Sequence, residues 1–201
     1  MDQQTISVYD RSAEQIAEQH KMLVPTRIYQ LVNKFFIKGE ACADVGCGIG
    51  RDSAWLSEQG YPVISIDASE GMLQQARQLN PNAYFIQDSL PLLKKQADSS
   101  FTNVLCSAVI MHLADDQIAC AVTNLVRITA VDGVLIISFR GTNSKDHREN
   151  GKLYSVIKLD KLVSLFTQAG TRLLHGEIDY QGDRDLEWTN IVLKKLPSLA
   201  V

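Results

Sequence analysis

The stretch from residue 44 to residue 73 reads DVGCGIGRDSAWLSEQGYPVISIDASEGML, and its pattern decides the fold. Three glycines, at positions 46, 48 and 50, stand between a short apolar segment and a segment with helical spacing. Gly60 is expected to end that helix, and the β-branched segment YPVISID then predicts a second strand that ends at Asp67. Strand, glycine turn, helix and strand in this order are typical of a parallel sheet with helices on both faces.

The sequence on either side continues the alternation of helices and strands. Upstream, apolar residues at helical spacing predict a helix over residues 28–36, preceded by a short helix with Ser12 as its N-cap. Downstream, Ser69 is expected to cap a helix, and AYFIQD, FTNVLCS and VLIISF to form strands. Helices are expected to begin near Asp115 and Asp160. The last two strand segments lie too close together for a helical crossover, which predicts an antiparallel hairpin at one edge.

Composition places the chain among globular proteins. Its 201 residues are 45% hydrophobic and 21% charged, the proportions of a single globular domain. A net charge of -3 gives no electrostatic footprint for nucleic acid or an anionic membrane. The beginning, MDQQTISVYD, lacks a signal-peptide pattern, and no apolar run reaches the roughly 18–20 residues of a membrane span. The four cysteines form no C-x-x-C pair, so we expect a cytoplasmic protein with reduced thiols.

The glycine loop and Asp67 form a candidate nucleoside site. Glycines let the backbone approach a ligand closely, and a strand-end acid can accept hydrogen bonds from both hydroxyls of a ribose. The glycines run G-C-G-I-G and Arg51 follows, whereas a dinucleotide-binding loop has the spacing G-x-G-x-x-G. Asp44 is expected to face the ligand crevice, where a carboxylate repels a pyrophosphate but favours a sulfonium or an amino group.

This run resembles the first two motifs of the class I S-adenosylmethionine-dependent methyltransferases, and among them the small bacterial branch related to ubiquinone biosynthesis. The resemblance covers residues 5–140 well and the last 60 residues in pattern only. It implies a Rossmann-like, doubly wound α/β fold with a seven-stranded mixed sheet in the order 3-2-1-4-5-7-6. It also implies one domain over residues 1–201, with an N-terminal helical cover (1–38), a cofactor-binding core (39–140) and an acceptor-side loop, last helix and edge hairpin (141–201).

The resemblance further implies which residues hold S-adenosylmethionine. The acid that opens the loop would hold the methionine end with the loop backbone, and Asp67 would hold the ribose. Asp88 would approach the adenine and Tyr9 would close over the cofactor, although a turn role for Asp88 and a packing role for Tyr9 are the alternatives. The expected cofactor-binding residues are Tyr9, Asp44, Gly46, Cys47, Gly48, Gly50, Arg51, Asp67, Ala68, Ser69, Met72, Asp88, Ser89, Leu90, Ser107 and Ala108.

The acceptor side is less constrained by motifs. His112, just past the fourth strand, is the candidate catalytic base, and pocket lining is its alternative role. The segment over residues 140–155 is expected to form a long loop without regular structure, and such loops are usually functional. Trp188 is expected to pack in the edge hairpin. Candidates for the acceptor wall are Arg140, His147, Arg148, Tyr154 and the segment 183–188.

The expected activity is methyl transfer from S-adenosylmethionine to a small-molecule acceptor, with S-adenosylhomocysteine as product. Two alternatives are a non-catalytic S-adenosylmethionine-binding module that acts through a protein partner, and a nicotinamide-dependent oxidoreductase. The turns after the fourth strand that are typical of DNA amino-methylating, cytosine-C5 and magnesium-dependent catechol enzymes are missing, so no metal is expected. O-, N-, S- and C-methylation and the oligomeric state stay open.

Replacing Asp67 tests the ribose assignment. If its carboxylate accepts both ribose hydroxyls, Asp67→Ala should weaken S-adenosylhomocysteine binding by roughly 10- to 1000-fold. Thermal stability without ligand should change little, because a carboxylate facing an open crevice packs against few neighbours. Calorimetry and thermal melting measure the two effects. Unchanged affinity with a lowered melting temperature would mean that Asp67 caps the next helix instead.

Overall fold

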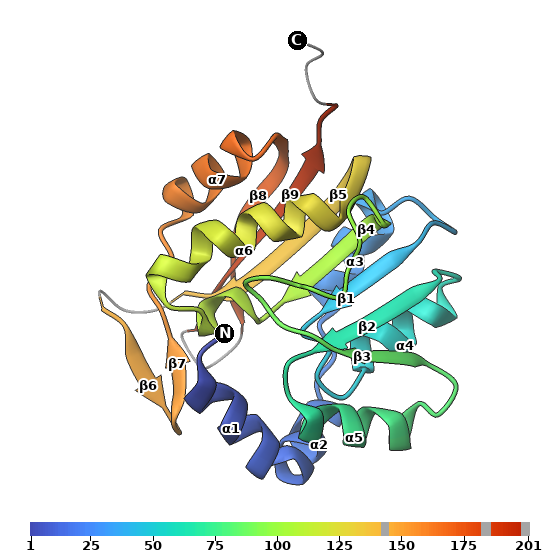
Figure 1. Cartoon of the computed structure of the whole chain (residues 1–201), viewed down its shortest axis with the longest axis vertical. Coiled ribbons are helices and arrows are strands. Elements are labelled where there is room, and N and C mark those ends of the chain that lie inside the picture. Colours follow the sequence, from blue (N-terminus) through green and yellow to red (C-terminus); the bar gives the residue numbers. More distant parts are fainter. Residues whose placement is uncertain (142–144, 182–185, 198–201) are drawn as a thin grey trace.

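The structure, a computed structural model, describes residues 1–141, 145–181 and 186–197 (Figure 1). A seven-stranded sheet has the order β3-β2-β1-β4-β5-β9-β8, which confirms the expected order 3-2-1-4-5-7-6. The strands from β3 to β5 are parallel, whereas β9 pairs antiparallel with both β5 and β8. The strands of this sheet are β1 (Cys42–Val45), β2 (Val63–Asp67), β3 (Tyr84–Gln87), β4 (Phe101–Ser107), β5 (Thr129–Arg140), β8 (Thr171–Gln181) and β9 (Leu186–Lys195).

Helices cover both faces of the sheet. In Figure 1, α6 and α7 lie in front of the sheet and α3 and α4 lie behind it. Each strand divides its side chains between the two sides, because successive residues point to opposite faces. Leu135 and Ile137 pack in the core under α6 and α7, whereas Val134 and Ile136 pack under α3 and α4. The helices are α1 (Gln3–Arg11), α2 (Ala13–Lys21), α3 (Thr26–Phe35), α4 (Arg51–Glu58), α5 (Glu70–Leu79), α6 (Asp115–Ile128) and α7 (Leu159–Gln168).

The N-terminal cover consists of two helices and rests on α5. Figure 1 shows α1, α2 and α5 together beyond one end of the sheet. The Asp10 carboxylate of α1 accepts hydrogen bonds from the Ser69 hydroxyl at 2.6 Å and from the Gly71 amide at 3.0 Å. Ala13, Ile16 and their neighbours bury an apolar cluster against α5. These contacts hold the cover over the carboxyl ends of the central strands.

Two elements differ from the sequence-based expectation. Only one short helix was expected before residue 25, but α1 precedes it, and Ser12 occupies the N-cap position of α2 without a side-chain capping bond. The segment over residues 140–155 does not lack regular structure, because β6 (His147–Glu149) and β7 (Lys152–Tyr154) pair there as an antiparallel hairpin. Strands of three residues are too short for an alternating pattern to reveal them.

The β6–β7 hairpin forms its own two-stranded sheet and packs against α1. The Leu153 amide donates to the Thr5 hydroxyl at 2.9 Å, and Arg148 forms an ion pair with Asp2 at 2.9 Å. A methyl group at Gly151 would come within 2.9 Å of Val8, so the hairpin turn lies directly against the helix. Helix α1 thus contacts α5 on one side and the hairpin on the other.

Gly71 of α5 packs directly against the backbone of Asp10 in α1, and its replacement tests that packing. A Cβ at this position would lie 2.8 Å from the Asp10 carbonyl oxygen, so Gly71→Ala should lower stability by about 1–3 kcal/mol. The loss should occur even though alanine favours a helix interior over glycine. Thermal melting measures it, with Gly176→Ala as control, since a Cβ there meets only ordinary contacts at 3.8 and 4.0 Å. Equal melting temperatures for the two variants would contradict this close packing.

Candidate functional site

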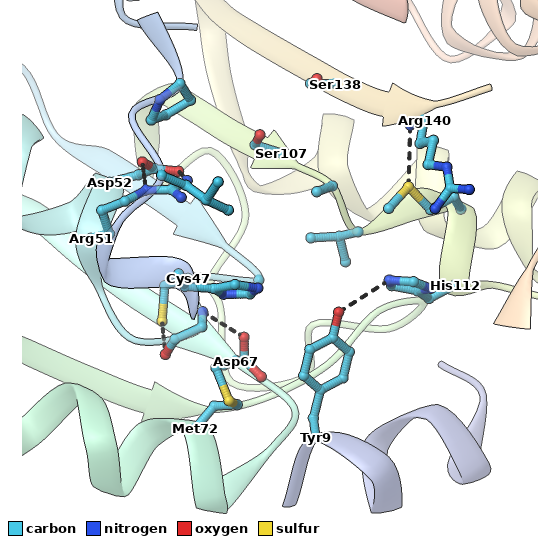
Figure 2. Close-up of a pocket in the computed structure, with 18 of the residues that line it drawn as sticks. Tyr9, Cys47, Arg51, Asp52, Asp67, Met72, Ser107, His112, Ser138 and Arg140 are labelled. Atoms are coloured by element: carbon cyan, nitrogen blue, oxygen red, sulfur yellow. Dashed lines mark hydrogen bonds and ion pairs between the residues drawn. The ribbon is translucent and has the colours of Figure 1, made fainter. Parts of the chain in front are cut away.

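A cavity of about 340 Å³ opens where the central parallel strands end. Its walls come from the glycine loop, the ends of β2, β4 and β5, and the segments of α1, α2 and β7 that cover them. This is the edge at which open α/β sheets bind ligands. Figure 2 shows Asp67, Cys47 and Met72 on one side of the cavity, with His112 and Arg140 on the other.

The glycine loop has the geometry that requires glycine. Gly46 has φ +80°, and a Cβ there would lie 2.1 Å from the Val109 side chain. Gly50 has φ +75° at the N-cap of α4, and a Cβ there would lie 2.9 Å from the Phe85 ring. Both positions therefore exclude a side chain, and of the two glycines Gly46 lines the cavity whereas Gly50 is buried behind it. Gly48 also lines the cavity and points its amide at Asp67.

Asp67 connects the glycine loop to the start of α5. One carboxylate oxygen accepts the Gly48 amide and the other accepts the Ser69 amide, both at 2.8 Å. Burial raises the pKa of this carboxyl group. The Ser69 hydroxyl accepts the Met72 amide at 3.1 Å, which confirms Ser69 as the helix cap. Asp67 thus makes more local contacts than the sequence suggested, and Asp67→Ala should lower stability as well as affinity.

Asp44 does not face the crevice, contrary to expectation. It shares a face of β1 with Cys42, so its side chain points into the layer under α3 and α4. There it is 2% exposed and accepts a hydrogen bond from the Ser53 hydroxyl at 2.6 Å. Burial, reinforced by the charge of Asp52, raises its pKa to about 7. Asp44 therefore lies behind the loop, and its part in cofactor binding stays a prediction.

Arg51 and Asp52 take the place on the cavity wall that was expected for Asp44. They form a two-point ion pair at 2.8 and 2.9 Å, and the Tyr29 hydroxyl donates to Asp52 at 3.0 Å. Arg51 was among the expected binding residues, whereas Asp52 was not. Asp52 lies in the first turn of α4, where the sequence does not indicate whether a side chain faces the cavity.

The cavity lining does not include Asp88, Ser89 or Leu90. The Asp88 carboxylate accepts the backbone amides of Ser89, Lys94 and Lys95 at 2.8, 3.2 and 2.8 Å. Leu90 is buried in the main core. The observed position of Asp88 is therefore the turn-forming alternative, and its contact with an adenine stays a prediction.

Other expected residues do meet at the cavity. Ser107 and Ala108 end β4, and the Ala108 amide donates to the Ser138 carbonyl at 2.8 Å, which fixes the strand end. Burial raises the pKa of the Cys47 thiol, so Cys47 presents a neutral side chain to the cavity. The expected binding residues that line the cavity are Tyr9, Gly46, Cys47, Gly48, Arg51, Asp67, Ala68, Ser69, Met72, Ser107 and Ala108.

His112 and Tyr9 form a polar pair across the cavity (Figure 2). The His112 ring is 3% exposed, and its Nδ1 lies 2.5 Å from the Leu153 carbonyl oxygen. A carbonyl only accepts, so Nδ1 carries the proton and Nε2 keeps a lone pair, 3.4 Å from the Tyr9 hydroxyl. Burial, helped by the positive charges of Lys152 and Arg140, lowers the pKa of His112 to about 4. His112 is therefore a neutral acceptor at neutral pH.

The far wall combines aromatic and basic side chains. Arg140, Tyr154 and Trp188 line the cavity, as does Lys152, which sequence reasoning missed along with its hairpin. His20 of α2 also lines the cavity, and no sequence motif had pointed to it. His147 stacks on Tyr154 and Arg148 pairs with Asp2, and neither is part of the wall. Residues 183–185, also acceptor candidates, lie outside the described residues.

Within residues 1–141, 145–181 and 186–197, no group of three or more His, Cys, Asp or Glu side chains is arranged to hold a metal ion. Within the same ranges, the helices are all too short or too polar to span a bilayer.

Comparisons with known proteins agree with this site. A family model described as a methyltransferase domain matches residues 42–133. The ubiquinone biosynthesis O-methyltransferase of Coxiella burnetii is 28% identical over 150 residues, which cover 72% of this chain and 60% of that protein. The malonyl-[acyl-carrier protein] O-methyltransferase of Hamiltonella defensa is 30% identical over 138 residues, covering 66% of this chain and 50% of that protein. The chain thus spans between half and two thirds of these relatives.

Among solved structures, the fold resembles the 1,6-didemethyltoxoflavin-N1-methyltransferase of Burkholderia thailandensis. Its TM-score is 0.79 at 16% identity, over 96% of this chain and 88% of that one. Fold and site together define a Rossmann-like domain with a cavity at the ends of its central strands. The chain is thus similar in sequence to methyltransferases over residues 42–133, and its fold is the one found in S-adenosylmethionine-dependent methyltransferases.

The buried histidines should make stability depend on pH. Burial lowers the pKa of both His112 and His20 from 6.5 to about 4. Between these values the unfolded chain binds more protons, so stability present above pH 6.5 is lost as the pH falls toward 4. The His112→Gln substitution removes one of these groups. The free energy of unfolding should therefore fall less between pH 7 and pH 4.5 in the variant than in the wild type, by on the order of 1–3 kcal/mol. Denaturant unfolding at pH 4.5, 5.5 and 7 measures the effect, and parallel curves for variant and wild type would contradict it.

Proposed function

We propose that this chain transfers a methyl group from S-adenosylmethionine to a small-molecule acceptor. The observation that carries the proposal is Asp67, whose two carboxylate oxygens are fixed by backbone amides at the cavity wall. Each oxygen has accepted one hydrogen bond and has capacity for another, as the two hydroxyls of a ribose require. The match of residues 42–133 to a methyltransferase domain and the glycine loop beside this carboxylate support the same cofactor.

The cofactor side of the cavity fits a nucleoside with a cationic tail. A Cβ at Gly46 would collide with the Val109 side chain, and Gly46 lines the cavity together with Cys47 and Gly48. The Asp67 carboxylate lines this side, and its negative charge favours the sulfonium and ammonium of S-adenosylmethionine, whereas the charge of Asp52 is balanced by Arg51. That cofactor supplies an electrophilic methyl group when bound. The residues named here would orient it, and positioning supplies much of the rate in such a displacement.

His112 is the candidate proton acceptor. Its neutral Nε2 points into the cavity, and the Leu153 carbonyl holds the tautomer that leaves this nitrogen unprotonated. The Tyr9 hydroxyl, whose pKa burial raises, stays protonated and can donate to Nε2 until an acceptor hydroxyl or ammonium replaces it. A pKa of about 4 makes His112 a weak base, so it suits an acceptor whose proton is already acidic.

The size and closure of the site favour a small acceptor. A cavity of about 340 Å³ is at the lower end of the range for small-molecule sites, and α1 and β7 cover it. Closure of this kind excludes water from the reacting groups.

Binding and turnover together test the proposal. Calorimetry should show binding of S-adenosylhomocysteine at micromolar or lower concentration and none of NAD, whereas the reverse would favour the oxidoreductase. With a panel of hydroxyl, amino and thiol metabolites, release of S-adenosylhomocysteine should accompany methylation of one acceptor class. The His112→Asn substitution should then lower kcat by about 10²- to 10⁴-fold while cofactor affinity stays within about twofold. Cofactor binding without turnover of any metabolite would favour the non-catalytic module.

A further inference from the structure

Two cationic side chains lie together at the acceptor side of the cavity. Arg140 ends β5, and Figure 2 shows it beside His112, across the cavity from Asp67. Its guanidinium carbon lies 4.8 Å from the centre of the Tyr154 ring. Lys152 begins β7, and its ammonium lies 5.2 Å from the centre of the Tyr9 ring. Because Tyr9 and Tyr154 both adjoin His112, the two cations flank the candidate base.

Both cations have unused capacity to bind an anion. The Arg140 Nη1 donates to Glu149 at 2.8 Å, but its Nε is buried without a hydrogen-bond partner among the described residues. Lys152 is half-buried and forms no ion pair within the same part of the chain, and burial lowers its pKa. An N–H group buried without a partner is costly, so a ligand oxygen that accepts from it would be favoured.

Glu149 does not satisfy both groups. It lies opposite Lys152 in the β6–β7 pair, yet its single carboxylate is bonded to Arg140. The contact of Lys152 with the Tyr9 ring stabilises a cation only modestly and leaves the Arg140 Nε unchanged. The other arginines of the wall donate through two nitrogens to their partners, Arg51 to Asp52 and Arg27 to Glu177, whereas Arg140 donates to Glu149 through Nη1 alone.

We propose that the methyl acceptor is a small organic acid whose carboxylate is held between Arg140 and Lys152. This inference rests on the proposed function, since it assigns the acceptor of that reaction. A carboxylate can accept from the Arg140 guanidinium with one oxygen and from the Lys152 ammonium with the other. The rings of Tyr9, Tyr154 and Trp188 on the same wall favour a planar body for this acid.

Matched acids and amides test the charge preference directly. Benzoate and 4-hydroxybenzoate are titrated against benzamide and 4-hydroxybenzamide, with and without saturating S-adenosylhomocysteine, by ligand-observed NMR. Each amide keeps the shape of its acid, loses the charge and has an NH2 donor in place of one acceptor oxygen. The wild-type protein should bind each acid at least about tenfold more tightly than its amide, because charge-assisted hydrogen bonds are the stronger ones.

Variants assign the preference to the two cations. Lys152→Met should weaken acid binding about 10- to 100-fold and leave amide binding within about twofold, whereas Lys152→Arg should retain most of the preference. Lys38→Met, which removes an exposed lysine outside the cavity wall, should change neither. Melting temperature and S-adenosylhomocysteine affinity verify that each variant is folded.

The outcomes separate this inference from the proposed function. Wild-type protein without a preference for acids over amides overturns the inference, including the case in which neither binds. An acid preference that survives in Lys152→Met also overturns it. Failure of S-adenosylhomocysteine to bind would instead contradict the proposed function, and the titrations without it would still report on the anion site.

Discussion

The Asp67 carboxylate joins the parts of the molecule that have to meet at the ligand. It ends β2, accepts the amide of Gly48 from the loop after β1, and accepts the amide of Ser69 before α5. Two consecutive crossovers of the sheet are therefore fixed to each other through one side chain. The Ser69 hydroxyl in turn donates to Asp10, so the position of α1 depends on the same point. Loop, helix and cover are arranged around this charge, which the surrounding amides stabilise although burial raises its pKa.

The cavity is electrostatically divided, and its two halves are built by different means. Near the glycine loop, carboxylates lie at and behind the wall, and the backbone supplies the remaining polar groups. On the opposite side, Arg140 and Lys152 are positive, and together with burial they keep His112 neutral. A neutral imidazole between two cations gains little by taking up a proton unless negative charge arrives with the substrate. The protonation state of the base and the charge of its substrate are thus physically linked.

Sequence reasoning succeeded where the signal is local or periodic. The edge hairpin, the Ser69 cap and the glycine positions follow from patterns that backbone geometry imposes, whereas the strand order came from the family resemblance. It failed where membership of the site depends on the direction in which a side chain points or on contacts distant in the sequence. Asp44 was placed in the crevice, but the alternation of β1 directs it toward Ser53. The position of Asp88 depends on amides six and seven residues away, and Lys152 lies on a hairpin too short to be detected.

The β6–β7 hairpin contributes to the cavity without belonging to the main sheet. It is inserted between β5 and α7, pairs only with itself among the described strands, and is held by contacts to α1. Changes in its length or side chains therefore leave the ladder of the seven-stranded sheet and the glycine loop intact. Substitutions in this short hairpin can change the acceptor side of the cavity. The side that Asp67 organises does not depend on the hairpin and can stay the same. Divergence among relatives of this fold is then expected to concentrate between β5 and α7.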